Sequence, residues 1–240
     1  ASPILDKREE RIGSMFRAIA PWDDRLNHLL SLNVDRSWRR RTTSLVRPES
    51  DGPILDVCTG TGDLALEYDR ASRGTLPIVG VDFCRELLQR AAAKVQAAGA
   101  DRRITLIEAD AQRLPFGENQ FQIVCVAFGL RNITDTDRGL AEMVRVARPG
   151  GRVAVLEFSR PRNPIVRRSY LLFFRHVLPR LGNMLSRSPD AAYSYLPESV
   201  LQFPDYEALA ERMEKHGLTD VRFFPFTGGI ATLYVGWKRP

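Results

Sequence analysis

The stretch Ile54–Leu64, with the sequence ILDVCTGTGDL, decides the fold of this chain. A short apolar run with the composition of a β-strand ends in a glycine-rich turn, and a segment compatible with a helix follows. Gly60 and Gly62 lack a Cβ atom, so the backbone can turn tightly there and come close to a ligand. Strand–loop–helix units of this kind bind nucleotides at the edge of a parallel sheet. The alternative interpretation is an ordinary tight turn between a strand and a helix.

An acidic residue follows this loop at the spacing that ribose recognition requires. Residues 78–81 form the next apolar run, which ends in Asp82. A carboxylate about 20 residues beyond a glycine-rich loop is placed to accept hydrogen bonds from ribose hydroxyls. The loop and Asp82 together indicate a ligand that contains a ribose.

The residues around the loop distinguish between nucleotide ligands. Ala65 occupies the third position of a G-x-G-x-x-G fingerprint, which keeps a nicotinamide cofactor open. Asp63 places a carboxylate at the start of the helix, where it would repel a pyrophosphate and favour a cation or an amino group. No Lys-Ser or Lys-Thr pair follows the loop, which excludes a P-loop. The pattern suits S-adenosylmethionine, which carries a ribose, an amino acid tail and a sulfonium but no phosphate.

The composition is that of a soluble α/β enzyme. With 240 residues, of which 44% are hydrophobic, the chain is long enough for one large domain. No apolar run approaches the ~20 residues that span a bilayer, and the charged residues 1–11 do not resemble a signal peptide. The three histidines are scattered, and no C-x-x-C pair occurs among the cysteines. We therefore expect a cytoplasmic protein with reduced thiols and without a metal site; the cysteines are Cys58, Cys84 and Cys125.

The chain is basic, with a formal net charge of +6. Such a charge is compatible with an anionic membrane surface or with nucleic acid. Nucleic acid is the less favoured partner, because the sequence contains no basic motif flanked by aromatic residues and no signature of base-flipping catalysis.

Strand and helix patterns alternate through the rest of the chain. This alternation indicates βαβ units and a parallel sheet, and two final strands joined closely by Thr227-Gly228-Gly229 would pair antiparallel. We therefore predict an α/β fold of the Rossmann-like class I methyltransferase type. It has a mostly parallel seven-stranded sheet, a C-terminal antiparallel hairpin and helices on both faces. Further strands are expected at 104–107, 121–127, 152–158, 219–226 and 230–238, and helices at 84–98, 137–148 (ended by Pro149-Gly150-Gly151) and 206–216.

Two blocks are more specific than the glycine loop, which marks only a methyltransferase superfamily. They are AFGLRN at 127–132 and LEFS at 156–159. Through them the chain resembles the ubiquinone/menaquinone-biosynthesis C-methyltransferases. The resemblance covers nearly the whole chain, with further blocks at 15–21, 26–31, 38–39, 55–64, 81–83, 114–116, 195–199 and 227–230.

The resemblance implies transfer of a methyl group from S-adenosylmethionine to a ring carbon of a polyprenylated quinol. The Cys-Thr-Gly-Thr-Gly-Asp loop favours a demethylmenaquinol as the acceptor. The alternative is a 2-polyprenyl-6-methoxy-1,4-benzoquinol of ubiquinone synthesis, or both acceptors. Two other functions stay open: methylation of another lipid or small aromatic, and a non-catalytic scaffold subunit of a quinone-biosynthesis complex. The intact loop and Asp82 argue against the scaffold.

The resemblance also assigns the cofactor contacts near the glycine loop. Thr61, between Gly60 and Gly62, donates its hydroxyl to the amino acid tail of the cofactor, and Asp82 accepts from the ribose. No metal is implied. These residues follow the C-terminal ends of strands, where ligands bind in open α/β sheets.

The other cofactor contacts follow the third and fourth strands. Asp110 and Ala111 are expected to recognise the adenine amino group, although a helix N-cap is the alternative for Asp110. Ala127 is expected to lie near the sulfonium. The family often has serine at this position, so a side-chain hydroxyl contact is absent here.

The chemistry requires a positive group beside the acceptor ring. A hydroquinone carbon becomes nucleophilic when a neighbouring phenol loses its proton, and the methyl group must then approach in line at ~3–3.5 Å. We assign Arg131 and Asn132 to this catalytic site. Because a guanidinium stays protonated, Arg131 is an electrostatic stabiliser of the phenolate rather than a base; its alternative role is a structural ion pair. Glu157 is a weaker candidate base, and it equally suits a role in holding a loop.

We expect a single domain over residues 1–240. It divides into an N-terminal helical lid (1–50), a cofactor-binding core (51–160), an insertion or lid (161–204) and a C-terminal helix with a hairpin (205–240). In the first lid the chain has Asp23, preceded by Trp22, where the family usually has a tyrosine. Either Trp22 takes the place of that tyrosine over the substrate, or the lid differs from that of the family.

Residues 161–187 combine aromatic and aliphatic side chains with several arginines. This pattern predicts a lid that binds a long isoprenoid tail and touches the inner face of an anionic membrane. The alternative is a buried lid helix with a solvated basic face. A homodimer is also left open.

Overall fold

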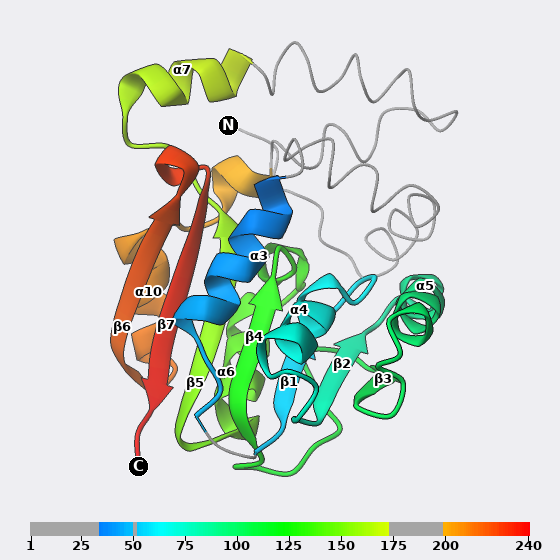
Figure 1. Cartoon of the computed structure of the whole chain (residues 1–240). Helices are drawn as coiled ribbons and strands as arrows, with labels where there is room; N and C mark the ends of the chain where they lie inside the picture. Colours follow the sequence, from blue (N-terminus) through cyan, green and yellow to red (C-terminus); the bar gives the residue numbers. More distant parts are fainter. Residues whose placement is uncertain (1–33, 50–51, 173–198) are drawn as a thin grey trace.

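The computed structural model describes residues 34–49, 52–172 and 199–240 (Figure 1). Its elements alternate between helix and strand, as the sequence pattern predicts. In chain order they are α3 (Val34–Leu45), β1 (Ile54–Val57), α4 (Asp63–Ala71), β2 (Ile78–Asp82), α5 (Arg85–Ala97), β3 (Ile104–Glu108), β4 (Phe121–Ala127), η1 (Leu130–Asn132), α6 (Thr136–Val146), β5 (Ala147–Phe158), α7 (Pro164–Leu172), α10 (Glu207–Lys215), β6 (Leu218–Phe226), η3 (Thr227–Gly229) and β7 (Ala231–Lys238).

The strands form one seven-stranded sheet in the order β3-β2-β1-β4-β5-β7-β6. The first five strands in the chain pair in parallel, whereas β7 is antiparallel to both β5 and β6. The predicted fold class is thereby confirmed. The sequence pattern did not predict that β7 would lie between β5 and β6. In the sheet, β2 and β3 follow on one side of β1, and β5 follows on the other side of β4, so the strand order reverses between β1 and β4. Open α/β sheets bind ligands in the crevice beyond the carboxyl ends of the strands at such a point.

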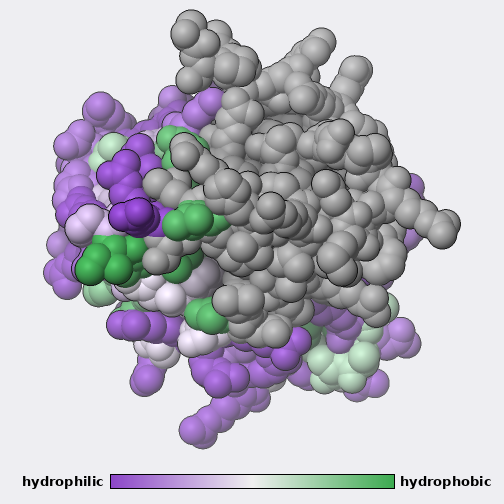
Figure 2. All heavy atoms as spheres, turned by 90° about the horizontal axis from the view of Figure 1, so that it is seen from above, coloured by the Kyte–Doolittle hydropathy of each residue, from purple (hydrophilic) through white to green (hydrophobic). Residues whose placement is uncertain are grey.

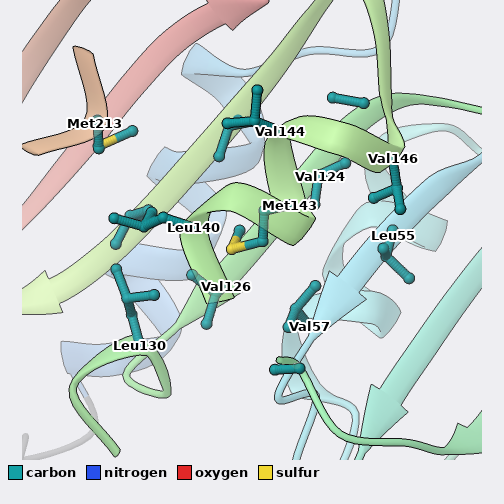
Figure 3. Close-up of a cluster of buried hydrophobic side chains, with 14 of the residues drawn as sticks. Leu55, Val57, Val124, Val126, Leu130, Leu140, Met143, Val144, Val146 and Met213 are labelled. Carbon is teal, nitrogen blue, oxygen red and sulfur yellow. The ribbon is translucent and has the colours of Figure 1, made fainter. Parts of the chain in front are cut away.

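Helices cover both faces of the sheet (Figure 1), and successive side chains of a strand point to opposite faces. Val124 and Val126 of β4 face the side covered by α6 and α10, where they join Leu140 and Met143 in one core cluster (Figure 3). The alternate residues Ile123 and Cys125 point to the other face and belong to a second cluster, formed with α3 and α4. Because both faces are covered, β1 and β4 are buried along almost their whole length.

The end of α6 differs from the prediction. The helix begins after Asp135, whose side chain accepts a hydrogen bond from the backbone N–H of Arg138 at 3.0 Å. It ends at Val146 rather than at residue 148, because Ala147 is already extended and pairs with Phe121 of β4. The Pro-Gly-Gly segment lies inside the irregular start of β5, where the pairing register shifts. Gly150 adopts φ +70°, which few other residues tolerate.

Helix α3 is the described part of the predicted N-terminal lid, and it packs on α4. Trp38 of this helix is buried, and its indole Nε1–H donates a hydrogen bond to Thr227 Oγ1 at 2.8 Å. The helix is thereby fastened to the turn between β6 and β7. Trp22 and Asp23 lie outside the described residues, as do residues 173–198 of the predicted second lid (161–204).

Within the described ranges, none of the helices is both long enough and apolar enough to cross a membrane.

Candidate active site

A cavity opens beyond the C-terminal ends of β1, β2 and β4. It brings together residues that lie far apart in the sequence, and most of the predicted site residues line it. These are Gly60, Thr61, Asp82, Asp110, Ala111, Ala127, Arg131 and Asn132. Gly62 is the exception. A Cβ at residue 62 would lie 3.3 Å from the Cβ of Ala91, so this glycine lets the loop pack against α5.

The glycine loop is held by bonds to the strands around it. Thr59 donates its backbone N–H to the carbonyl of Val81 at 2.9 Å and its hydroxyl to Asp56 Oδ2 at 2.6 Å. Gly60 has φ +56°, and a Cβ placed on it would have open space around it. The backbone at this glycine therefore borders the cavity directly and leaves room for a ligand.

Asp82 connects the loops that follow β1 and β2. Its Oδ2 accepts the backbone N–H of Gly60 and its Oδ1 that of Cys84, each at 2.9 Å. Burial raises the pKa of this carboxyl to about 6, although the backbone bonds to Cys84 and Gly60 favour the charged form. Each carboxylate oxygen has a second lone pair, so Asp82 can still accept hydrogen bonds from a ligand in the cavity.

Asp56 is a cavity residue that the sequence analysis did not single out. It lies within β1, and burial raises its pKa to about 7; the Thr59 hydroxyl and the charge of Arg39 oppose this rise. The signal was present in the sequence, as a carboxylate in the middle of an apolar run. A buried acid with this pKa changes its charge near neutral pH.

Lys94 of α5 is a second residue that sequence reasoning missed. Its Nζ forms an ion pair with Asp63 and donates to Thr61 Oγ1 at 3.1 Å. The cation expected beside Asp63 is thus supplied within the chain. The sequence spacing gave no indication that α5 would bring this lysine to the loop.

Asp110 does not cap a helix. Its Oδ1 accepts the backbone N–H of Gln112 at 2.8 Å, and residues 111–113 form a turn from which no helix begins. The turn brings Asp110 and Ala111 to the cavity edge beyond β3, the position expected for adenine recognition. Their roles toward the cofactor stay predictions.

The backbone after β4 is unusual. Phe128 has φ +59° and Cys58 has φ +53°, values that are rare for residues other than glycine and cost energy. A Cβ at Gly129 would overlap the Cβ of Cys58, so only glycine permits the two loops to meet. The ring of Phe128, which lines the cavity, stacks on that of Phe158 with 4.6 Å between centroids.

Arg131 and Glu157 form a buried ion pair at the same end of β4. Arg131 Nη1 lies 2.8 Å from Glu157 Oε2, and the side chains are only 8% and 1% exposed. Nη1 also donates to the carbonyl of Phe128 at 2.6 Å, and Glu157 Oε1 accepts the backbone N–H of Arg131 at 3.3 Å. The Nε atom is buried and has no hydrogen-bond acceptor among the described residues. The structural ion pair is therefore present, and Arg131 lines the cavity as well.

Arg39 brings a second guanidinium to the cavity. It comes from α3, forms an ion pair with Asp35, and its Cζ lies 5.6 Å from the centroid of the Phe128 ring. Sequence reasoning noticed it only as part of the block 38–39. The contact depends on how α3 packs across the sheet, so no local pattern indicates it.

The chemistry of these groups fits S-adenosylmethionine. Carboxylates after β1 and β2 can accept hydrogen bonds from ribose hydroxyls and an ammonium, and they would repel phosphates. The open space beside Gly60 allows close approach of a ligand to the loop. The arrangement is that of a class I methyltransferase.

Comparisons with known proteins agree on the family. Residues 4–238 match the family described as the ubiE/COQ5 methyltransferase family. A relative from Geobacter sp. (strain M21), named ubiquinone/menaquinone biosynthesis C-methyltransferase UbiE, is 44% identical over 98% of this chain and 99% of its own length. A demethylmenaquinone methyltransferase from Deinococcus radiodurans is 45% identical over 99% of this chain and 97% of its own.

Solved structures support the fold alone. The [4+2]-cyclase SpnF superposes with a TM-score of 0.70 at 15% identity over 95% of each chain. A SAM-dependent methyltransferase from Aquifex aeolicus gives 0.60 at 15% identity over 83% of this chain and 88% of its own. Because a cyclase shares this fold, the activity has to be inferred from the family match.

The chain belongs to the ubiE/COQ5 methyltransferase family. The resemblance predicted from the AFGLRN and LEFS blocks is confirmed, and the chain is an S-adenosylmethionine-dependent C-methyltransferase.

The buried carboxyl of Asp56 predicts a pH dependence of stability. Its pKa is about 7 in the folded chain against 3.8 for a free side chain, so between these values the folded state keeps a proton that the unfolded state has released. Stability therefore falls as pH rises from about 4 to about 7. In Asp56→Asn this contribution disappears, and the free energy of unfolding of the variant relative to wild type should rise over that window by a few kcal/mol, on the order of the pKa shift.

Urea denaturation at pH 5 to 8 measures this difference. Asp101→Asn, at an exposed position, is the matched control and should follow the wild type at every pH. A constant difference between Asp56→Asn and wild type across the window would show that Asp56 does not titrate there.

Proposed function

We propose that this chain methylates a ring carbon of a demethylmenaquinol, the acceptor in the menaquinone branch of quinone synthesis. The proposal is supported by the relative named demethylmenaquinone methyltransferase and by the chain's own AFGLRN block. The observation that carries it is the position of Arg131, a buried cation at the end of β4, in the same cavity as Asp82. Methylation of a benzoquinol is the second candidate, because the Geobacter relative is named for both pathways.

The cofactor positions follow from the same geometry. We assign the ribose hydroxyls to Asp82, the amino acid tail to Thr61 and its neighbouring glycines, and the adenine to Asp110 and Ala111. Ala127, at the end of β4, then lies beside the sulfonium. These residues border one continuous cavity, which supports the assignment.

S-adenosylmethionine supplies an electrophilic methyl group, and the chain must prepare the acceptor ring. We infer that Arg131 stabilises the phenolate formed when the quinol hydroxyl releases its proton to water. Glu157 offsets the cost of burying the guanidinium and fixes its position, since an unpaired buried charge is strongly unfavourable. The Phe128 ring provides an apolar wall that excludes water. As the new C–C bond forms the C–S bond breaks; the ring carbon then loses its proton to water, and the oxygen regains a proton to give the methylated quinol.

Methyl transfer from labelled S-adenosylmethionine tests the acceptor. The purified chain should label reduced demethylmenaquinone in preference to the reduced demethylated ubiquinone precursor when both are offered separately. Equal labelling would indicate an enzyme of both pathways. Label in neither acceptor, with cofactor binding intact, would refute the proposed acceptors and favour another aromatic substrate or a scaffold role.

Arg131 is tested by removing its charge. Because Arg131→Ala leaves Glu157 buried and unpaired, the informative variant is the double change Arg131→Gln/Glu157→Gln, which removes both charges. Its kcat should fall by about 10²–10³-fold while cofactor affinity stays within a few-fold of wild type. Arg138→Gln, on the exposed side of α6, is the control. A double variant with near-wild-type kcat would remove Arg131 from the mechanism.

Helix α7 supports the proposed contact with a membrane surface. Ile165 and Leu172 are 76% and 52% exposed and lie seven residues apart, so they share one face of the helix. Arg167 and Arg168, which lie between these two residues in the sequence, are exposed as well, whereas Tyr170 is buried against the protein. In Figure 1 α7 lies past the ends of the parallel strands, at the end of the molecule where the cavity residues also lie. Figure 2 shows hydrophobic and hydrophilic residues side by side on this end.

Such a surface suits an anionic bilayer, because arginines attract its headgroups and aliphatic side chains enter the interface. We propose that α7 rests on the membrane that dissolves the isoprenoid tail of the acceptor.

Two further expectations stay predictions: the division of the chain into lids and a core, and the formation of a homodimer.

Co-sedimentation with phosphatidylglycerol vesicles at low salt tests this contact. The double variant Ile165→Ser/Leu172→Ser should reduce the bound fraction at least about tenfold, because two large apolar side chains no longer enter the interface. Leu45→Ser, which removes an exposed leucine at the far end of α3, should bind like wild type. Equal binding by all three proteins would exclude α7 as the contact.

A further inference from the structure

The charges around the cavity suit the ammonium group of the amino acid tail of S-adenosylmethionine better than they suit its carboxylate. Four carboxylates line it, which suits an ammonium group, a sulfonium and ribose hydroxyls; they are Asp56, Asp63, Asp82 and Asp110. The carboxylate of an amino acid tail would be repelled by this set. It needs a cation, and among the described residues that line the cavity the cations are Arg39 and Arg131.

Arg131 is committed elsewhere. Its Nη1 is shared between Glu157 and the carbonyl of Phe128, at 2.8 and 2.6 Å. The negative charge of Glu157 already neutralises it in a buried setting. In the mechanism proposed above this guanidinium serves the phenolate of the acceptor, so the carboxylate of the tail needs the other cation of the cavity.

Arg39 is placed differently. It lines the cavity together with Asp56 of β1. Its Cζ also lies 5.6 Å from the Phe128 ring, at the end of β4. Arg39 thus borders the same cavity as Gly60 and Thr61 of the glycine loop. A tail that runs from the sulfonium region at Ala127 toward this loop passes it.

The surrounding structure holds Arg39 in this position. Its ion pair with Asp35, one helical turn earlier, engages Nη1, and a planar guanidinium carries further N–H donors that can reach a ligand. Both residues belong to α3, which Trp38 fixes to the hairpin through its bond to Thr227. The Trp38 ring meets Phe158 edge-on at 6.1 Å, and Phe158 in turn stacks on Phe128. The guanidinium thus comes from a firmly anchored helix.

We propose that Arg39 binds the carboxylate of the amino acid tail of S-adenosylmethionine, with Asp35 orienting its guanidinium. The inference rests on the cofactor positions proposed above, and it is independent of which quinol is methylated. Ammonium and carboxylate are then recognised by opposite charges on different elements: the carboxylates of β1 and β2, and the arginine of α3. A guanidinium suits this role because it can donate two parallel hydrogen bonds to one carboxylate.

Two cofactor-like ligands that differ only in the carboxylate give the test. S-adenosylhomocysteine has the full tail, and S-adenosyl-3-thiopropylamine lacks the carboxylate. Calorimetric titration of the full chain should show that Arg39→Gln weakens S-adenosylhomocysteine binding by about 10- to 100-fold, the range of a charged hydrogen bond. Affinity for the thiopropylamine should change less than about threefold, because that ligand makes no contact for the substitution to remove. Arg39→Lys should recover part of the loss.

The matched control is Arg40→Gln, since Arg40 is the next residue of α3 and its side chain is 79% exposed. It should bind both ligands like wild type. Because Arg39→Gln leaves Asp35 buried without its cation, the double variant Asp35→Asn/Arg39→Gln is titrated in parallel and should show the same selective loss.

Equal weakening of both ligands in these variants would overturn the proposal and assign Arg39 a structural role; so would unchanged binding of S-adenosylhomocysteine. No acceptor is present in the titration. A chain that binds S-adenosylhomocysteine through Arg39 and yet fails to methylate either quinol would refute the proposed acceptors alone.

Discussion

The loops that follow β1 and β4 meet so closely that residue 129 has no room for a side chain. This contact decides how the rest of the site is arranged. A Cβ at Gly129 would overlap that of Cys58, and the backbone on both sides of the contact, at Cys58 and Phe128, takes up left-handed conformations. Strain of this kind persists only where the surroundings enforce it. Here the buried central strands hold both loops, and the strain fixes the direction in which Phe128 and η1 leave β4.

The buried charged groups of the site differ between its two sides. On the β1 and β2 side, Asp56 and Asp82 lie in a dehydrated environment that raises the pKa of both carboxyls toward neutrality. On the β4 and β5 side, Arg131 and Glu157 neutralise each other at 2.8 Å. The first group retains capacity to accept hydrogen bonds from a positively charged or hydroxyl-rich ligand. The second keeps a fixed cation at the place proposed for the phenolate, without an uncompensated buried charge.

Aromatic rings join these two sides. Phe128 and Phe158 stack on each other, Trp38 contacts both, and the guanidinium groups of Arg39 and Arg131 lie within 5.6 and 5.3 Å of the Phe128 and Phe158 centroids respectively. Cations at such distances from aromatic rings are weakly attracted to them. The arrangement links a helix before the sheet, the turn after β4 and the end of β5. Displacing any one of these elements would disturb the others.

The sequence by itself determined the fold class and the seven strands, because hydrophobic periodicity and the glycine loop are local signals. The family followed from the resemblance carried by the AFGLRN and LEFS blocks. Most of the site residues predicted from the sequence do line the cavity, since each lies at or after the end of a strand that can be located from the pattern. It misplaced the end of α6, where pairing of Ala147 with β4 overrides the helical pattern. Only the tertiary structure decided that Lys94 reaches Asp63, that Arg131 pairs with Glu157, and that Arg39 enters the cavity. These contacts join residues from elements whose mutual placement depends on packing across the sheet, and no local spacing encodes that placement.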